Sequence, residues 1–274
     1  MDDLIICVAP CPGENQKEKF PGRLNVSEEV IRSYEAGASI VHLHVRDKEG
    51  LQTTDTDLFS EQVQTIRTAS NMIIEGSTGG TPEHTLAQRC ISVTVSGIEL
   101  GSLNLGSVNM AGGVYQNPMS DIRYYATELK SRRIKPSMCV FDLSMLHNAE
   151  RLAKSGLLEG TQVYNLIFDV PDALPYSPEV LKFFSAQLPK DAVWFLTRHH
   201  ARGWPAFQDA LEHDGHVRVG YEDGPFLATG ERARSNAELV EEIVKAAHQV
   251  GRKVVGPKRA REILGMYPEN RDNA

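Results

Sequence analysis

Cysteine is scarce in this 274-residue sequence, which contains only four. Cys7 and Cys11 are separated by three residues, while Cys90 and Cys139 stand alone, so no second pair completes a structural zinc site. A chain of this length can bury enough apolar surface to fold without disulfides or a structural metal. We therefore expect reduced, structural thiols, a cytoplasmic location, and any bound metal to serve chemistry.

Long apolar runs and basic runs are also absent. No run of about 18 apolar residues occurs, so we expect no membrane span, and Met1-Asp2-Asp3 carries acids where a signal peptide would carry bases. Lys and Arg total 29 against 36 Asp and Glu, which gives a formal net charge of −7. Nucleic acid and anionic membranes are therefore not expected partners, whereas local Arg and Lys still allow an anionic small substrate.

Three common nucleotide-binding or catalytic motifs are missing. No Gly-x-Gly-x-x-Gly follows the first expected strand and no phosphate-loop motif occurs, which disfavours a doubly wound nucleotide-binding sheet. No Gly-x-Ser-x-Gly elbow occurs, which disfavours a Ser-His-Asp hydrolase. No linker or low-complexity stretch divides the chain, so we expect one domain over residues 1–274.

Short apolar runs bounded by turn residues predict eight strands, because near-continuous hydrophobic runs are typical of parallel strands covered on both faces. The runs are Leu4–Ala9, Ile40–Val45, Met72–Gly76, Ile98–Leu103, Lys135–Phe141, Val163–Phe168, Ala192–Thr197 and Val217–Tyr221. Helical patterns lie between them, at Val26–Ala36 (with Asn25 and Glu28 as a capping box), Asp55–Ala69, Pro82–Cys90, Pro118–Arg132, Ser144–Ser155, Pro178–Gln187, Pro205–Leu211 and Asn236–Val250, and a last short helix is expected at Pro257–Leu264. Eight alternating units predict an α/β fold, the (β/α)₈ or TIM barrel, with a short C-terminal extra helix.

Polar residues gather where the expected strands end, which is the active-site end of such a barrel. In chain order they are Glu14, His42 and His44, Ser77–Gly80, Ser102 and Asn104, Asp142, Asp169, Arg198–His200, and Glu222 with Asp223.

His42-Leu43-His44 is the sharpest local signal. Side chains alternate along a strand, so the two histidines face one side and Leu43 faces the other. Their backbones are then about 6–7 Å apart, which lets both imidazoles reach one ion. The alternative is a pair of hydrogen-bonded histidines in a polar barrel end. The apolar strand before them and Arg46-Asp47 after them favour a divalent metal site, most simply zinc.

A catalytic zinc site usually has three protein ligands and an open position, so a carboxylate from another strand end is expected. Glu222 is the best candidate, and the adjacent Asp223 can then do acid–base work; the alternative for both is a solvated turn before Gly224-Pro225. Arg218 lies inside an apolar strand, where it needs a partner such as Asp223. Ser77–Gly80 is either a plain turn or a loop that binds a substrate carboxylate or oxyanion.

Five segments, in this order, resemble the β-keto acid cleavage enzymes, a family that includes the enzyme cleaving 3-keto-5-aminohexanoate in lysine fermentation. They are His42–Asp47, Ser77–Gly80, Glu99–Asn104, Gly215–Asp223 and Ser235–Val240. The resemblance covers nearly the whole chain.

The resemblance implies a zinc-bearing TIM barrel, assembled as a homotetramer, that converts a β-keto acid and acetyl-CoA into acetoacetate and a new CoA thioester. It implies that His42, His44 and Glu222 bind Zn²⁺, and that Asp223 and Arg218 generate the nucleophile, with Ser77 beside them. It also implies substrate contacts at the following positions, the first of which would receive an ammonium group: Glu14, Ser77, Gly80, Ser102 and Asn104.

The chain departs from the family at three places. Cys139 stands where the family tends to carry a Glu, and the segments Asp169–Ala173 and Arg198–Ala201 differ from the family's usual loops. The substrate side chain and the acyl acceptor therefore stay open: Glu14 favours an amino- or trimethylammonium-bearing keto acid, whereas the basic Arg198 segment favours an acidic one. Two other functions also remain, a metal-dependent hydrolase or lyase that uses no CoA, and a non-catalytic binding barrel.

Overall fold

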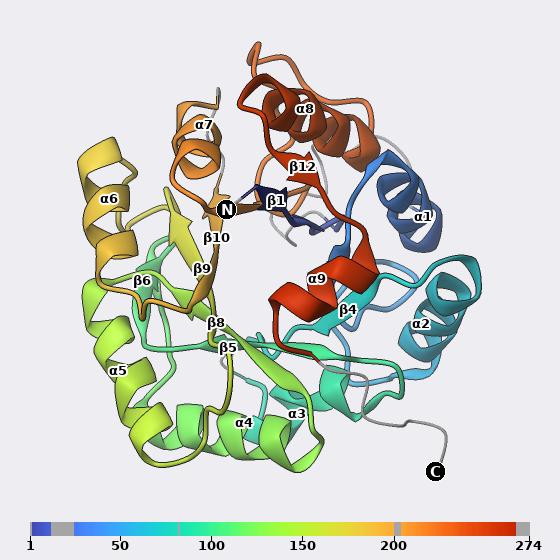
Figure 1. Ribbon diagram of the computed structural model, residues 1–274. Helices are drawn as coiled ribbons and strands as arrows, with labels where there is room; N and C mark the ends of the chain where they lie inside the picture. Colours follow the sequence, from blue (N-terminus) through green and yellow to red (C-terminus); the bar gives the residue numbers. More distant parts are fainter. Residues whose placement is uncertain (1, 12–24, 82, 200–203, 267–274) are drawn as a thin grey trace.

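The computed structural model describes residues 2–11, 25–81, 83–199 and 204–266. The barrel strands are β2 (Ile6–Val8), β3 (Ile40–Leu43), β4 (Ile73–Gly76), β5 (Leu100–Asn104), β8 (Lys135–Val140), β9 (Val163–Phe168), β10 (Val193–Arg198) and β11 (His216–Val219). They are all parallel and close a barrel in the order β10-β11-β2-β3-β4-β5-β8-β9, which confirms the predicted (β/α)₈ fold (Figure 1).

Helices surround the barrel, one after each strand (Figure 1). They are α1 (Val26–Ala36), α2 (Asp57–Ala69), α3 (Leu86–Arg89), α4 (Met119–Ser131), α5 (Leu143–Lys154), α6 (Pro178–Ala186), α7 (Pro205–Glu212) and α8 (Asn236–Gln249), followed by α9 (Pro257–Ile263). Across the described residues, none of the helices is both long and apolar enough to cross a membrane.

Local signals account for where the helices begin and end. Asn25 caps α1 by accepting from the Glu28 backbone N–H, and Gly37 ends the helix at φ 122°. The Glu28 carboxylate pairs with Arg32 instead of the Asn25 backbone N–H. The second hydrogen bond of the expected capping box is therefore not among the contacts of the described residues. The helix expected over 82–90 is shorter than predicted: α3 has only four residues, and a 3₁₀ turn over Ile91–Thr94 follows it.

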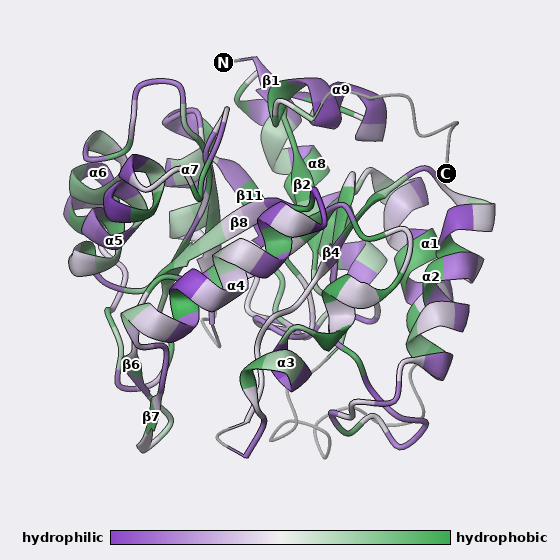
Figure 2. Ribbon diagram, turned by 90° about the horizontal axis from the view of Figure 1, so that it is seen from below, coloured by the Kyte–Doolittle hydropathy of each residue, from purple (hydrophilic) through white to green (hydrophobic). Residues whose placement is uncertain are grey.

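The amino-terminal end of the barrel is apolar inside and closed. Inward-facing residues such as Ile40, Ile73 and Leu100 pack together there with Ala260 and Leu264, which come from α9 and the residue after it. Figure 2 shows α9, with β1 (Asp3–Leu4), at one end of the barrel and the β6 and β7 strands at the opposite end. Strand β1 pairs with β12 (Lys253–Val254), which fastens the start of the described chain beside α9. Water is therefore kept from this end of the interior.

Towards the carboxyl ends of the strands the interior becomes polar. On β3, β4 and β5 a buried polar residue lies two positions after the apolar one. These residues are His42, Glu75 and Ser102. Two short strands that the sequence did not predict, β6 (Val108–Met110) and β7 (Gly113–Tyr115), form an antiparallel hairpin after β5. The polar layer and this hairpin lie at the end where the active site was expected.

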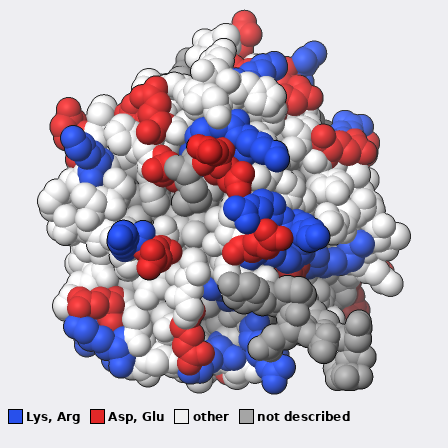
Figure 3. Space-filling model, viewed as in Figure 1, with Lys and Arg blue, Asp and Glu red and all other residues white. Residues whose placement is uncertain are grey.

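Charged residues of both signs are mixed on the face that Figure 3 shows, which is viewed as in Figure 1. The buried Glu99 accepts hydrogen bonds from both Arg67 and Arg261, and Asp3 accepts from Arg259. These ion pairs tie the strand starts to α9.

Candidate metal and active site

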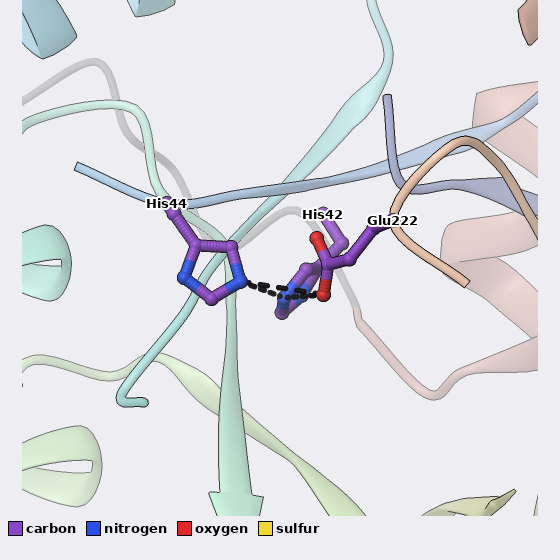
Figure 4. Close-up of side chains that lie close together, drawn as sticks. All are labelled: His42, His44 and Glu222. Atoms are coloured by element: carbon purple, nitrogen blue, oxygen red, sulfur yellow. Dashed lines mark hydrogen bonds and ion pairs between the residues drawn. The ribbon is translucent and has the colours of Figure 1, made fainter. Parts of the chain in front are cut away.

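Strand β3 brings two imidazoles together. His42 is inside the strand and His44 follows one residue after its end, and their Nε2 atoms are 3.2 Å apart. His42 is buried and His44 is partly buried. Figure 4 shows both rings directed towards the carboxylate of Glu222, which lies 178 residues after His44 in the sequence.

The turn after β11 delivers that carboxylate. Gly220 has a φ of 145°, and a β-carbon there would lie 2.2 Å from the Ala9 carbonyl oxygen, so only glycine fits this turn. The Glu222 backbone N–H then donates to Ala9 O at 3.1 Å. As a result Glu222 Oε1 lies 3.3 Å from His44 Nε2 and 3.6 Å from His42 Nε2.

Arg218 holds both acids of the turn. Its Nε donates to Asp223 Oδ2 at 2.8 Å, and its Nη2 donates to Asp223 Oδ1 at 2.9 Å and to Glu222 Oε1 at 2.7 Å. The expected pairing of this buried arginine with Asp223 is confirmed. Burial works against the charge of Arg218, but Asp223 and Glu222 raise its pKa well above the usual value.

The electrostatics favour a neutral imidazole beside an ionised carboxylate. Burial lowers the pKa of His44, and Glu222 raises it by less. Burial would raise the pKa of Glu222, but His44, Arg218 and His42 together hold it well below its usual value. Neutral imidazole nitrogens and carboxylate oxygens are the forms that bind metal ions.

The three ligand atoms fit a zinc ion. Ligands about 2.0–2.1 Å from a tetrahedral zinc ion lie ~3.3 Å from one another. The observed separations among His42 Nε2, His44 Nε2 and Glu222 Oε1 are 3.2, 3.3 and 3.6 Å. Glu222 Oε2 is buried and has no hydrogen-bond partner in the described part of the chain, so it too is available to a cation. The possible ligand atoms of His42, His44 and Glu222 all lie within 4.8 Å of one another, so these three residues could hold a metal ion together.

A second group of predicted residues lies at the ends of β4 and β5. The Thr78 N–H donates to Ser102 Oγ at 3.0 Å, and the Gly79 N–H donates to Ser77 Oγ at 3.0 Å. A β-carbon on Gly79 would lie 3.1 Å from Ser77 Oγ and 3.7 Å from His44 Cε1. The loop therefore runs close beside His44.

Tyr115, at the end of the β6–β7 hairpin, is a neighbour that the sequence did not reveal. Its hydroxyl oxygen accepts from Arg89 Nη2 at 2.9 Å and from Asn104 Nδ2 at 3.2 Å, and it bonds the Gly80 backbone. Burial raises the pKa of Tyr115, so the phenol keeps its proton at neutral pH. Asn104 and Gly80, both expected to contact substrate, thus meet at this hydroxyl.

Three of the polar strand ends have other roles. Asp142 caps α5 through the Ser144 N–H, and Asp169 forms an ion pair with Arg198 at 2.5 Å. His199 Nε2 lies 3.6 Å from Asp223 Oδ1. Glu14 and His200 lie outside the described residues.

The four cysteines are free and buried, as expected of structural thiols. Burial, followed by the charge of Glu75, raises the pKa of Cys139 to about 12. At the position of the family's Glu, this chain therefore has a neutral thiol.

Sequence comparisons match nearly the whole chain to known proteins. The sequence profile of the beta-keto acid cleavage enzymes matches residues 3–266. The 3-keto-5-aminohexanoate cleavage enzyme of Acetoanaerobium sticklandii is 35% identical over 272 residues, which are 97% of this chain and 99% of that protein. The 3-oxoadipate:acetyl-CoA acetyltransferase of Cupriavidus necator is 32% identical over 270 residues, which are 96% of this chain and 94% of that protein.

A solved structure shares the fold. The ternary complex of ObcA with a C4-CoA adduct and oxalate matches with a TM-score of 0.71 at 19% identity, over 88% of this chain and 66% of that chain. At this identity the match supports the barrel architecture alone.

Proposed function

We propose that this chain, which belongs to the β-keto acid cleavage enzyme family, cleaves a β-keto acid with acetyl-CoA at a zinc ion held by His42, His44 and Glu222. The products would be acetoacetate and the CoA thioester of the remaining acyl group. The observation that carries the proposal is the triangle of ligand atoms, whose edges of 3.2, 3.3 and 3.6 Å match a tetrahedral zinc site.

When bound, the zinc ion would polarise the β-keto oxygen as a Lewis acid and hold the substrate. Asp223 would remove a proton from the carbon between the two carbonyl groups, and Arg218 orients the carboxylate by donating to both of its oxygens. The electron pair left on that carbon attacks the acetyl carbonyl and displaces the CoA thiolate. The thiolate then takes the substrate's acyl group, the carbon–carbon bond breaks, and the proton returns from Asp223.

The loops beside the zinc ligands suit the carboxylate of the substrate. Ser77 and Ser102 offer hydroxyl groups, and Asn104 and Tyr115 complete one side. Arg89 Nη2 donates to the Tyr115 oxygen at 2.9 Å, and this contact with a guanidinium makes the Tyr115 O–H a stronger donor. We infer that Tyr115 donates to a carboxylate oxygen of the β-keto acid.

The charge of the substrate tail depends on Glu14 and on the basic segment that begins at Arg198, at the end of β10. Asp169 already pairs with Arg198, which reduces the positive charge that would favour an acidic tail. We therefore favour an amino- or trimethylammonium-bearing keto acid bound by Glu14. Comparing cationic, neutral and acidic substrates on the native enzyme and on Glu14→Gln tests this, and an unchanged preference ratio would show that Glu14 does not bind the tail.

The decisive experiment incubates zinc-loaded protein with a panel of β-keto acids, with and without acetyl-CoA, and measures acetoacetate and acyl-CoA. We expect both products only when acetyl-CoA is present, and neither from His44→Ala. His147→Ala is the matched control, because His147 is 70% exposed and contacts only Glu150 among the described ion pairs. Cleavage without acetyl-CoA would instead support a metal-dependent hydrolase or lyase, which the altered loops after β9 and β10 favour.

The family resemblance also implies a homotetramer and one zinc ion per chain. Light scattering on the purified protein tests the first, and metal analysis tests the second.

A further inference from the structure

Glu75 is a buried carboxylate that no role described above uses. It lies on β4 between the apolar Ile74 and the close-packed Gly76, and it is 5% exposed. In the parallel ladder its Cα partner is His42 of β3. Residues paired across neighbouring strands point to the same side of a sheet, so both side chains face the barrel interior.

The Glu75 carboxylate approaches the His42 ring at Nδ1, whereas Nε2 is the ring nitrogen close to the other proposed ligands. Glu75 Oε2 lies 3.5 Å from His42 Nδ1, and the two side chains are 6% and 4% exposed. His42 Nδ1 is buried and has no hydrogen-bond partner within the described residues. A buried donor and a buried carboxylate left apart would each lose free energy of solvation without compensation, so a shift of a few tenths of an ångström that closes the bond is favourable.

The position of one proton decides whether His42 can bind a metal. A neutral imidazole carries one N–H, and its other nitrogen is the ligand. A proton on Nδ1, donated to Glu75, leaves the lone pair on Nε2, which is the atom 3.2 Å from His44 Nε2. On the second histidine Gln52 Nε2 lies 3.3 Å from Nδ1, and turning this amide over would present its oxygen as the acceptor of an Nδ1 proton.

Glu75 also places a carboxylate near the position of Cys139. Cys139 stands where the family resemblance places a Glu, and the charge of Glu75 acts on the pKa of both Cys139 and Cys7, after burial. Its carboxylate therefore lies in the same enclosed space as the turn acids.

We propose that Glu75 is a positioning residue for the metal site, which accepts the Nδ1 proton of His42 and thereby fixes the ring orientation and the tautomer that presents Nε2 to zinc. This inference rests on the proposed zinc site. Carboxylates that hold a ligand histidine in this way typically change metal affinity by about 10- to 100-fold when they are removed.

The test measures the zinc Kd by competition with a chromophoric chelator for the native protein, Glu75→Ala and Glu75→Gln. We expect the Kd to rise about 10- to 100-fold in Glu75→Ala and by a smaller factor in Glu75→Gln, because an amide oxygen accepts the same proton without charge. Nitrogen-15 NMR of the histidine rings gives a second readout: the His42 Nδ1–H signal, assigned with His42→Ala, should shift or broaden in both variants.

Glu99→Gln is the matched control. Glu99 is another buried strand carboxylate, but Arg67 and Arg261 hold it at the other end of the barrel. It should lower the free energy of unfolding and leave the zinc Kd unchanged. A folded Glu75→Ala protein with a Kd within twofold of native would overturn the proposal; if that variant does not fold, an unchanged Kd in Glu75→Gln would overturn it. A native protein that binds no zinc would overturn the metal site itself.

Discussion

Replacing Asp223 with Asn tests the proposed base, because the change removes the negative charge and nearly keeps the shape. Asp223 is 2% exposed, and its two oxygens each accept a bond from Arg218, at 2.8 and 2.9 Å. An amide has one acceptor oxygen, so its NH₂ group would face a guanidinium N–H. The substitution therefore removes the base and one of the two hydrogen bonds between Arg218 and residue 223.

Two magnitudes follow from this geometry. Losing a positioned general base lowers kcat by about 10²- to 10⁴-fold. Breaking a buried ion pair usually costs about 3–5 kcal/mol when the remaining charge has no partner. Arg218 keeps Glu222 at 2.7 Å, so its charge stays compensated and we expect a loss of about 1–3 kcal/mol in the free energy of unfolding.

The assay separates proton removal from the rest of the reaction. Hydrogen–deuterium exchange at the carbon between the carbonyls, followed by NMR in D₂O without acetyl-CoA, reports the base step alone. Asp223→Asn should lose this exchange and keep its zinc, whereas Asp169→Asn, which alters another acid paired with an arginine, should keep both. Normal exchange in Asp223→Asn would make it a turn residue and place the base elsewhere, and loss of zinc would assign it to the metal site.

Three further predictions concern the pocket and the fold. Tyr115→Phe should raise the KM for the β-keto acid about tenfold or more and leave zinc content unchanged, because it removes one hydrogen bond to a charged group; an unaltered KM in steady-state kinetics contradicts the role. Gly220→Ala should lower the free energy of unfolding by about 3 kcal/mol or more, since its β-carbon would lie 2.2 Å from the Ala9 carbonyl oxygen. Gly230→Ala, with φ 82° and nothing within 4 Å, should cost about 1–2 kcal/mol in the same urea titration, and equal losses would refute the backbone clash. Burial, with Arg252, lowers the pKa of His216 to about 3, below an unfolded value of about 6.5, so the neutral form stabilises the fold above pH 6.5 and this contribution is lost as pH falls. Metal-free native protein should therefore lose about 2 kcal/mol more than His216→Asn between pH 7.5 and pH 5, and parallel pH profiles would show that His216 does not titrate in this way.

The fold was predictable because the signals for it are local and repeated. Each strand is a short apolar run, and the eight runs matched the eight barrel strands to within about two residues at each end. The β6–β7 hairpin was missed because its strands have three residues each and are partly exposed, so they show no apolar run. Tyr115 was missed with it, since its partners Arg89 and Asn104 are distant in sequence.

The site residues also differ in whether a local sequence pattern reveals them. His42 and His44 were visible because two residues apart on one strand places them on one side. Glu222 lies 178 residues after His44, and no local pattern joins them; the family resemblance supplied that match. Arg218 was assigned to a carboxylate from its burial in an apolar strand, and Glu75 carries the same signal in β4, so the same reasoning could have found it.

The barrel interior explains why these charges can act together. The amino-terminal half is filled by residues such as Ile40 and Leu100 and closed by Leu264, so water reaches the polar half only from the carboxyl ends of the strands. Charges in such a space interact more strongly than they do in water. The contacting set of Glu75, Glu222, Asp223 and Arg218 has three formal negative charges and one positive charge around two imidazoles. Arg46 is also buried, and its charge acts on the pKa of His44, so an excess of negative charge remains that a bound cation would offset. Two imidazole nitrogens beside a carboxylate are the ligand set that favours a divalent ion such as zinc.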